Sequence, residues 1–219
     1  MNTDKIDNGK KNLDQIVKDR RSTRNFSKEI PNEEDLMNIL KSCIYAPCGG
    51  AELSPEKRKI FVFKQGTENM TKAREIILSQ VKKSAKMMNR MLIFLPFLRK
   101  KMGTFAKKLK MISENGIPAL TDAGYFIVIA EKKGFPPVEN QSIAHALENM
   151  WLTATDSDIA FQMLTVVGQM SKNDQFMNLL NLKKGDYTLG GCAIGYPQTS
   201  VNKPKDFEFE KFIVLMDEV

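Results

Sequence analysis

The chain has 219 residues, enough for one substantial hydrophobic core, and 42% of them are hydrophobic, as in an ordinary globular protein. Its formal net charge is +7, but ten Lys and Arg residues lie between Ile76 and Ser113, where there is no Asp or Glu. Subtracting those ten charges leaves a net charge of −3 for the rest of the chain, so the chain is not basic throughout. Three cysteines without CxxC spacing and a single histidine give no indication of a disulfide framework, a zinc site or a Ser-His-Asp triad.

Two amphipathic helices are predicted near the N-terminus. Apolar residues recur at helical spacing over 13–20, and this helix is expected to end near Arg20. Asn32 can cap a second helix over 32–44, and Asp35 can answer it in the manner of a capping box. The sequence around this cap makes the second helix the clearest local prediction.

A basic run separates these helices. Arg20, Arg21 and Arg24 flank the hydroxyl groups of Ser22 and Thr23. Guanidinium groups beside small hydroxyls suit a phosphate, because each can bond two oxygens while remaining charged. The alternative is a solvated helix end, where arginine offsets the negative end of the helix dipole.

The remaining elements predict an α+β layer fold. Long helical patterns over 141–155 and 173–182 alternate with short apolar segments, whereas a strict βαβ repeat is absent. Four segments are predicted as strands: 59–64, 125–130, 187–196 and 207–216. Glycines weaken the third of them, which often marks a close neighbour or a ligand. We expect one domain over 1–219, with a basic, Met-rich helical excursion at about 70–115.

Four features in this order resemble the FMN-dependent nitroreductase family, and the resemblance covers most of the chain apart from roughly 66–116. They are the run Arg20–Phe26, the helix over 32–44, the Ala-Pro-Cys-Gly-Gly loop over 46–50 and the late Gly-Tyr-Pro at 195–197. The family implies a three-layer α+β fold, with a mostly antiparallel central sheet flanked by helices, and an intertwined homodimer. It also implies FMN at the subunit interface, reduced by NADH or NADPH, with electrons passing to nitroaromatic, quinone or related acceptors.

The resemblance carries over to particular residues. The FMN phosphate and ribityl chain would be held by Arg20, Arg21, Ser22 and Arg24. The isoalloxazine would lie near Pro47, Cys48 and Gly49, and the phosphate clamp would be completed by Lys203 and Lys205. The flavin would also be approached by the backbone of Ala160 and Phe161. No catalytic side chain and no metal are expected, because the flavin carries the chemistry. Cys48 is expected to be a small residue in a tight loop rather than a redox thiol.

The chain departs from the family pattern over 51–56, where the usual Asn, Gln and Trp are missing. A flavin-binding or storage protein without efficient turnover is therefore an alternative function. The basic segment over 76–113 has three readings: a lid over the flavin pocket, a plain helical hairpin, or a segment attracted to acidic lipids. A lid would be lined by Met87, Met88, Met91, Phe94, Phe97 and Met102.

A basic protein that acts on a membrane surface or a nucleic acid is the third class considered. We expect no nucleic-acid partner, because no recognised motif is present, and no membrane span, because the apolar run over 91–98 is far shorter than the roughly 20 residues needed. The polar N-terminal residues show no secretory signal, so the expected compartment is the cytoplasm.

Overall fold

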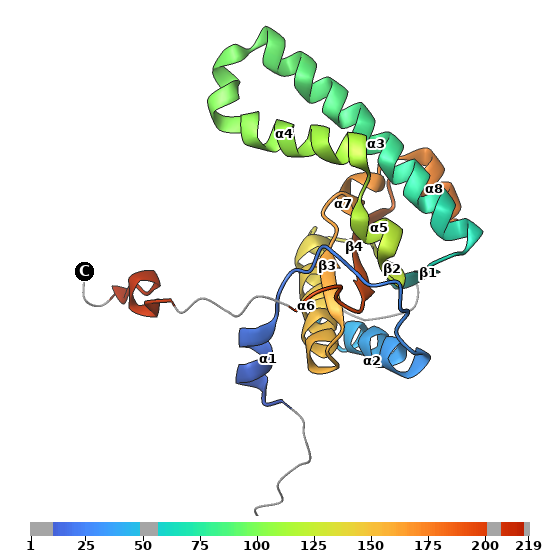
Figure 1. Cartoon of the computed structure of the whole chain (residues 1–219), viewed down its shortest axis with the longest axis vertical. Coiled ribbons are helices and arrows are strands. Elements are labelled where there is room, and N and C mark those ends of the chain that lie inside the picture. Colours follow the sequence, from blue (N-terminus) through green and yellow to red (C-terminus); the bar gives the residue numbers. More distant parts are fainter. Residues whose placement is uncertain (1–10, 49–56, 201–206, 217–219) are drawn as a thin grey trace, which may run out of the picture.

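A four-stranded antiparallel sheet forms the centre of the molecule in the computed structural model, which describes residues 11–48, 57–200 and 207–216. The strand order is β1-β2-β4-β3 (Figure 1). The strands are β1 (Arg58–Lys64), β2 (Tyr125–Lys132), β3 (Ala160–Met163) and β4 (Tyr187–Gly195). The expected α+β class and antiparallel sheet are confirmed.

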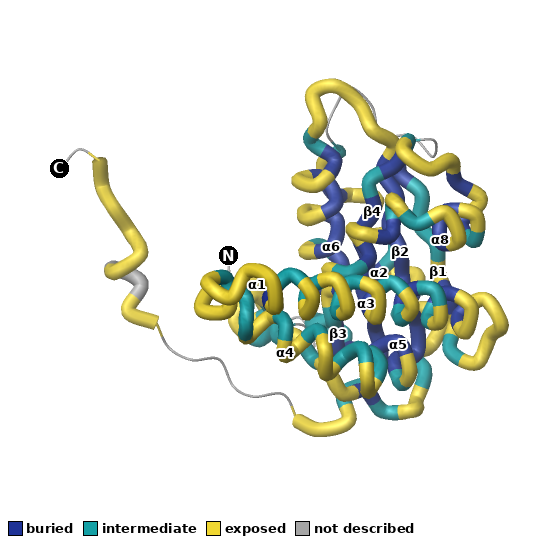
Figure 2. Tube along the Cα trace, turned by 90° about the horizontal axis from the view of Figure 1, so that it is seen from above, coloured by how far each residue is buried: buried dark blue, intermediate teal, exposed yellow. Residues whose placement is uncertain are grey.

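Helices cover both faces of this sheet and make it the middle of three layers. Alternate residues of β2 point to opposite faces, so Phe126 and Val128 join one core cluster while Ile127 and Ile129 join the other. The central strands are buried along most of their length, except at the exposed Lys132 and the half-buried Thr188 (Figure 2). On the Ile127 side lie α2 (Glu33–Ile44) and α6 (Glu139–Asp156); on the Phe126 side lie α3 (Glu68–Phe94), α5 (Pro118–Asp122), α7 (Val167–Met170) and α8 (Asp174–Leu179).

Side-chain caps fix where several helices begin. Asn32 accepts a hydrogen bond from the Asp35 backbone N–H at 2.8 Å, and its amide donates to the Asp35 carboxylate at 2.9 Å. This confirms the predicted cap, although the return bond is made between the two side chains rather than to the backbone. Asn12 caps the short helix α1 (Leu13–Asp19) in the same way.

The glycines of β4 allow close packing between layers. A Cβ at Gly191 would lie 2.8 Å from the Ile127 carbonyl oxygen, and one at Gly190 would overlap the side chain of Ile143 on α6. The glycines of this strand predicted a close neighbour or a ligand, and the structure places the adjacent strand β2 and the helix α6 against them.

One strand was not predicted, and one predicted strand was wrong. Residues 160–163 form the edge strand β3, which is not among the four segments predicted as strands. Residues 207–216 form no strand: Phe209–Phe212 is the short 3-10 helix η2, in a tail that extends away from the sheet (Figure 1). Without a neighbouring strand, an apolar segment has no partner for its backbone groups.

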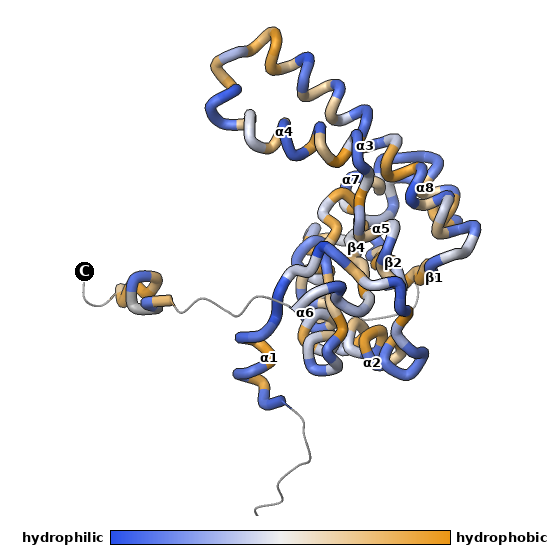
Figure 3. The backbone as a smooth tube through the Cα atoms, in the orientation of Figure 1, coloured by the Kyte–Doolittle hydropathy of each residue, from blue (hydrophilic) through white to orange (hydrophobic). Residues whose placement is uncertain are grey.

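A long helical hairpin projects from the other side of the molecule (Figure 1). Helix α3 leads through the short 3-10 helix η1 (Pro96–Leu98) into α4 (Arg99–Asn115). Apolar residues mark the turn of this hairpin, and hydrophilic residues follow at the start of α4 (Figure 3). No helix in the described part of the chain is both long and apolar enough to cross a membrane.

Candidate functional site

The arginine run lies against the edge of the sheet formed by β3. Ser22 forms an isolated parallel bridge with Phe161, and the Thr23 backbone N–H donates to the Phe161 carbonyl at 3.0 Å. Phe26 forms an antiparallel bridge with Pro197, just after β4. The structure therefore brings three distant parts of the sequence together: the arginine run, the predicted pair Ala160 and Phe161, and the Gly-Tyr-Pro segment.

Arg20 is anchored on the side chains of α6. Its guanidinium carbon lies 4.5 Å from the centroid of the Trp151 ring, and its Nε lies 3.0 Å from Glu148 Oε1. The Trp151 ring stacks on Phe161 with centroids 5.0 Å apart, and its Nε1–H donates to the Arg21 carbonyl at 3.3 Å. One aromatic pair thus holds both the basic run and the edge strand in place.

The other cations of the run keep donors available. Arg21 donates from Nη1 to the Arg20 carbonyl at 2.6 Å, and its other donors make no bond to the described residues. Arg24 and Ser22 are exposed, and Arg24 makes no ion pair with any residue that the structure describes. A site with free guanidinium donors and a hydroxyl can bind an oxyanion such as a phosphate.

The predicted loop residues Pro47 and Cys48 lie elsewhere, beside a buried ion pair. Arg58 donates to Glu131 Oε2 from Nε and Nη2 at 3.1 and 2.9 Å, and neither side chain is exposed. The same guanidinium donates to the backbone carbonyls of Cys43, Ala46 and Pro47 at 2.9–3.1 Å. Arg58 therefore fixes the end of α2 and the start of this loop.

The two sets of predicted residues occupy opposite ends of the sheet. Phe161 pairs with Ile194, which pairs with Tyr125, the first residue of β2. Arg58 pairs with Glu131, six residues further along β2, which is about 20 Å at the usual rise of a strand. Within one chain the described loop residues Pro47 and Cys48 therefore lie away from the arginine run. Gly49, Lys203 and Lys205 lie outside the described residues.

Cys48 has the environment of an unreactive thiol. Burial raises its pKa, and the nearby Glu131 carboxylate raises it further, while Arg58 and Lys57 partly offset these effects. A thiol must ionise to act as a nucleophile or redox group near neutral pH. The raised pKa agrees with the expectation that Cys48 is a small residue in a tight loop rather than a redox thiol.

Sequence reasoning missed four residues of these two sites: Trp151, Glu148, Arg58 and Glu131. Trp151 gave only the signal of an apolar position on a helix. Arg58 and Glu131 flank two predicted strands, where a charge usually marks the solvated end of a strand. Their pairing depends on the register of β1 and β2, which the sequence does not indicate.

The comparisons with known proteins agree with this geometry. The nitroreductase family profile matches residues 17–196. None of the curated proteins matches the chain in sequence. Among solved structures, a nitroreductase with bound FMN from Bacteroides fragilis has a TM-score of 0.68 at 18% identity, covering 94% of this chain and 99% of that one.

Two further solved structures show how varied the proteins with this fold are. A BluB-like flavoprotein from Clostridium difficile has a TM-score of 0.71 at 19% identity, over 94% of this chain and 99% of that one. An iodotyrosine deiodinase bound to FMN and 3-iodo-L-tyrosine has a TM-score of 0.63 at 18% identity, over 93% and 97%. At these identities the likeness establishes the fold.

Proposed function

The chain belongs to the nitroreductase family, and we propose that it is an FMN-dependent oxidoreductase. In this proposal NADH or NADPH reduces the flavin, and a nitroaromatic, quinone or related acceptor takes the electrons. The observation that supports it best is the meeting of the arginine run with Phe161 and the Gly-Tyr-Pro segment. The FMN in the Bacteroides fragilis relative adds support.

The residues present fit a phosphorylated flavin. Arg21, Arg24 and Ser22 offer uncommitted donors for the phosphate and ribityl oxygens. Arg20 would share its guanidinium between Glu148 and the phosphate, since one face is already held by Trp151. Lys203 and Lys205 complete the phosphate clamp in the proposal.

The chain's own contribution is to hold the flavin and shield it. Bound FMN supplies the redox chemistry by accepting a hydride and releasing electrons to an acceptor. The stacked pair of Trp151 and Phe161 keeps the arginine run fixed to the sheet, so the phosphate donors are positioned before binding. Both predicted contacts lie on the edge strand, where the Phe161 carbonyl accepts from Thr23 and Ala160 pairs with Gly195 of β4.

We propose a homodimer in which the loop at Pro47, Cys48 and Gly49 reaches the flavin held by a second copy. The separation of about 20 Å along β2 supports this, because a second copy could bring its loop beside the arginine run of the first. Exposed apolar side chains on the body and tail also suit burial by a second copy; they include Leu13, Val17, Tyr45, Phe212 and Leu215. Light scattering of the purified protein checks the expected mass of two chains.

The absorbance spectrum of the purified protein, supplied with FMN, tests the function. We expect flavin bands that bleach on anaerobic addition of NADH or NADPH and return when a quinone or nitroaromatic is added. Bands that do not bleach with either donor would favour the storage alternative, which the altered stretch over 51–56 motivates. Protein that binds no FMN would overturn the proposal.

A further inference from the structure

The α3–α4 hairpin combines a one-sided charge with an exposed apolar tip. Between Ile76 and Ser113 it carries ten Lys or Arg and no acidic residue. At its turn, Phe94 is 81% exposed and Phe97 is 73% exposed, and Ile93 in the last turn of α3 is 60% exposed. The described part of the chain therefore leaves most of the apolar surface at the outermost point of this projection uncovered.

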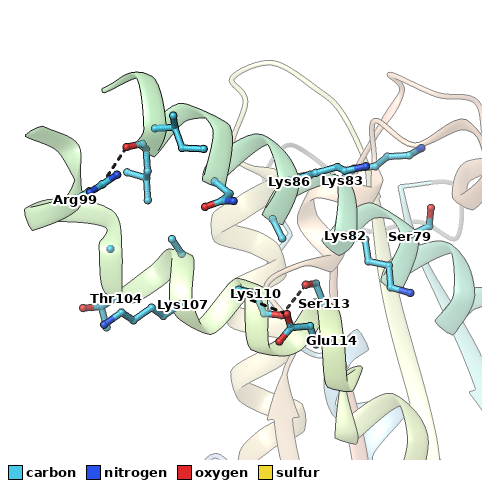
Figure 4. A pocket seen from close by; sticks show the side chains of 16 residues that line it. Ser79, Lys82, Lys83, Lys86, Arg99, Thr104, Lys107, Lys110, Ser113 and Glu114 are labelled. Carbon is cyan, nitrogen blue, oxygen red and sulfur yellow. Dashed lines mark hydrogen bonds and ion pairs between the residues drawn. The ribbon is translucent and has the colours of Figure 1, made fainter. Parts of the chain in front are cut away.

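Cations immediately adjoin this tip. Arg99, Lys100 and Lys101 follow the aromatic turn and are all exposed. Arg99 also donates from Nε to the Leu92 carbonyl at 3.3 Å, which joins the two arms just below the turn (Figure 4). The apolar tip and its cationic collar are therefore held together as one unit.

The space between the two arms continues this pattern. A groove of about 960 Å³ runs between α3 and α4 (Figure 4), with an apolar floor that includes Leu92 and Ile93. Its rim carries Lys82, Lys83, Lys86, Lys107 and Lys110. Long lysine side chains can cover apolar surface with their methylene groups while their ammonium groups reach outward.

We propose that this hairpin docks on an anionic lipid surface. The tip residues Ile93, Phe94 and Phe97 enter the boundary between headgroups and acyl chains, and the cations of the collar and rim contact lipid phosphates and carboxylates. An apolar tip bordered by cations is the arrangement by which peripheral segments bind acidic membranes. The docking rests on no flavin chemistry and stands apart from the proposed function.

Two other occupants fit the hairpin less well. A nucleic acid could take the cations and stack on Phe94 or Phe97, but the aliphatic Ile93 and Leu95 beside them have no role in base stacking. A second copy offers a weak electrostatic match, because the net charge of the chain outside the hairpin is only −3, against ten positive charges on the hairpin. A lipid surface accommodates aromatic, aliphatic and cationic groups at once.

Flotation of the full-length protein with vesicles tests the docking. We expect it to float with vesicles of phosphatidylcholine and phosphatidylglycerol, to stay unbound with phosphatidylcholine alone, and to be released by high salt. Replacing both aromatics, Phe94→Ala with Phe97→Ala, should weaken the partition on the order of 100-fold. Lys100→Glu with Lys101→Glu should weaken it by more than about tenfold.

Matched controls come from the body of the molecule. Phe135 is 95% exposed, so Phe135→Ala removes a highly exposed aromatic outside the hairpin, and Lys132→Glu with Lys133→Glu makes the same change of charge. Both controls should float like the natural chain. The proposal is overturned if the control variants lose vesicle binding as much as the hairpin variants do, or if the protein prefers polynucleotide to vesicles. It is also overturned if the Phe94 and Phe97 double variant changes the mass of the protein assembly in solution.

A fluorescent probe separates insertion from mere surface attraction. The only tryptophan, Trp151, is buried in the body, so Phe97→Trp adds a reporter at the tip. Brominated lipids in anionic vesicles should quench the tip tryptophan and leave the natural chain unquenched. Equal emission with and without brominated lipid would contradict insertion.

Discussion

The two ends of the sheet each carry arginine, in opposite states. Arg58 is fully buried, and its donors are taken up by Glu131 and by three backbone carbonyls. Arg24 is exposed and makes no ion pair with a described residue. The contrast indicates that the first arginine stabilises the chain, whereas the second has donors left for a ligand.

The largest effect on stability is expected from Arg58→Ala. The change leaves the Glu131 carboxylate buried without its partner and removes the bonds to the carbonyls of Cys43, Ala46 and Pro47. Breaking a buried pair in this way costs about 3–5 kcal/mol. Urea unfolding measures the loss.

Removing both charges together provides the control. Arg58→Met with Glu131→Leu replaces the buried pair with apolar groups, which is often close to neutral. The double variant should therefore be more stable than Arg58→Ala. If Arg58→Ala unfolds at the same urea concentration as the natural chain, the buried pair is not what holds this end of the sheet.

The second prediction concerns Cys43, which packs against the same ion pair. Burial raises the pKa of its thiol from 9.0 to about 11, with opposing smaller effects of Arg58 and Glu131. Between these pH values the unfolded chain loses a proton that the folded chain keeps. The stabilisation is therefore complete below pH 9.0 and disappears as the pH rises through about 11.

Comparison with Cys43→Ala isolates this contribution from other groups that titrate at high pH. Relative to the variant, the natural chain should lose on the order of 2–3 kcal/mol of unfolding free energy across this interval. Urea unfolding at pH 8, 9, 10 and 11 gives the difference for each pH. Parallel curves for the two proteins would mean that the thiol ionises normally in the folded chain.

The third prediction moves to the other end of the sheet, where Gly195 allows Phe26 to pack closely. A Cβ at this position would lie 3.0 Å from the Gly124 nitrogen and 3.1 Å from the Phe26 ring. Gly195→Ala should destabilise the chain by about 1–3 kcal/mol through overpacking. Gly103→Ala, where a Cβ meets nothing within 4 Å, is the matched control and should be neutral or slightly stabilising. Equal unfolding of both variants would contradict the close packing.

The smallest effect on stability is expected from the exposed cations. Arg21→Ala with Arg24→Ala removes no bond between described side chains, so unfolding should change by less than about 0.5 kcal/mol per site. Thermal unfolding without flavin checks this. A loss as large as that of Arg58→Ala would show that the run is structural, and the contrast between the two ends would fail.

Local signals predicted much of the fold. The cap at Asn32 and the apolar segments of β1, β2 and β4 follow from patterns a few residues long. The edge strand β3 has only four residues, too few for a clear alternation of side chains. The tail over 207–216 has a strand-like sequence, but no described strand lies beside it to pair with its backbone.

The site was predicted less completely, because its contacts join distant residues. The chemistry of Arg21, Ser22 and Arg24 is visible in the sequence, since donor type and spacing are local. The anchoring of Arg20 by Glu148 and Trp151 depends on how α6 packs beside the run. Likewise, the position of Pro47 at the far end of the sheet depends on strand order, which no local pattern encodes.

Binding of FMN tests the central claim most directly. Titration of the flavin-free natural chain, followed by quenching of flavin fluorescence, should give saturable binding of one FMN per chain. Arg21→Ala with Arg24→Ala should weaken it on the order of 100-fold while the protein remains folded, because two charge-assisted contacts are lost. The control pair Lys132→Glu and Lys133→Glu should bind as the natural chain does. Unchanged affinity in the arginine double variant would contradict the assignment of this end of the sheet to the flavin phosphate.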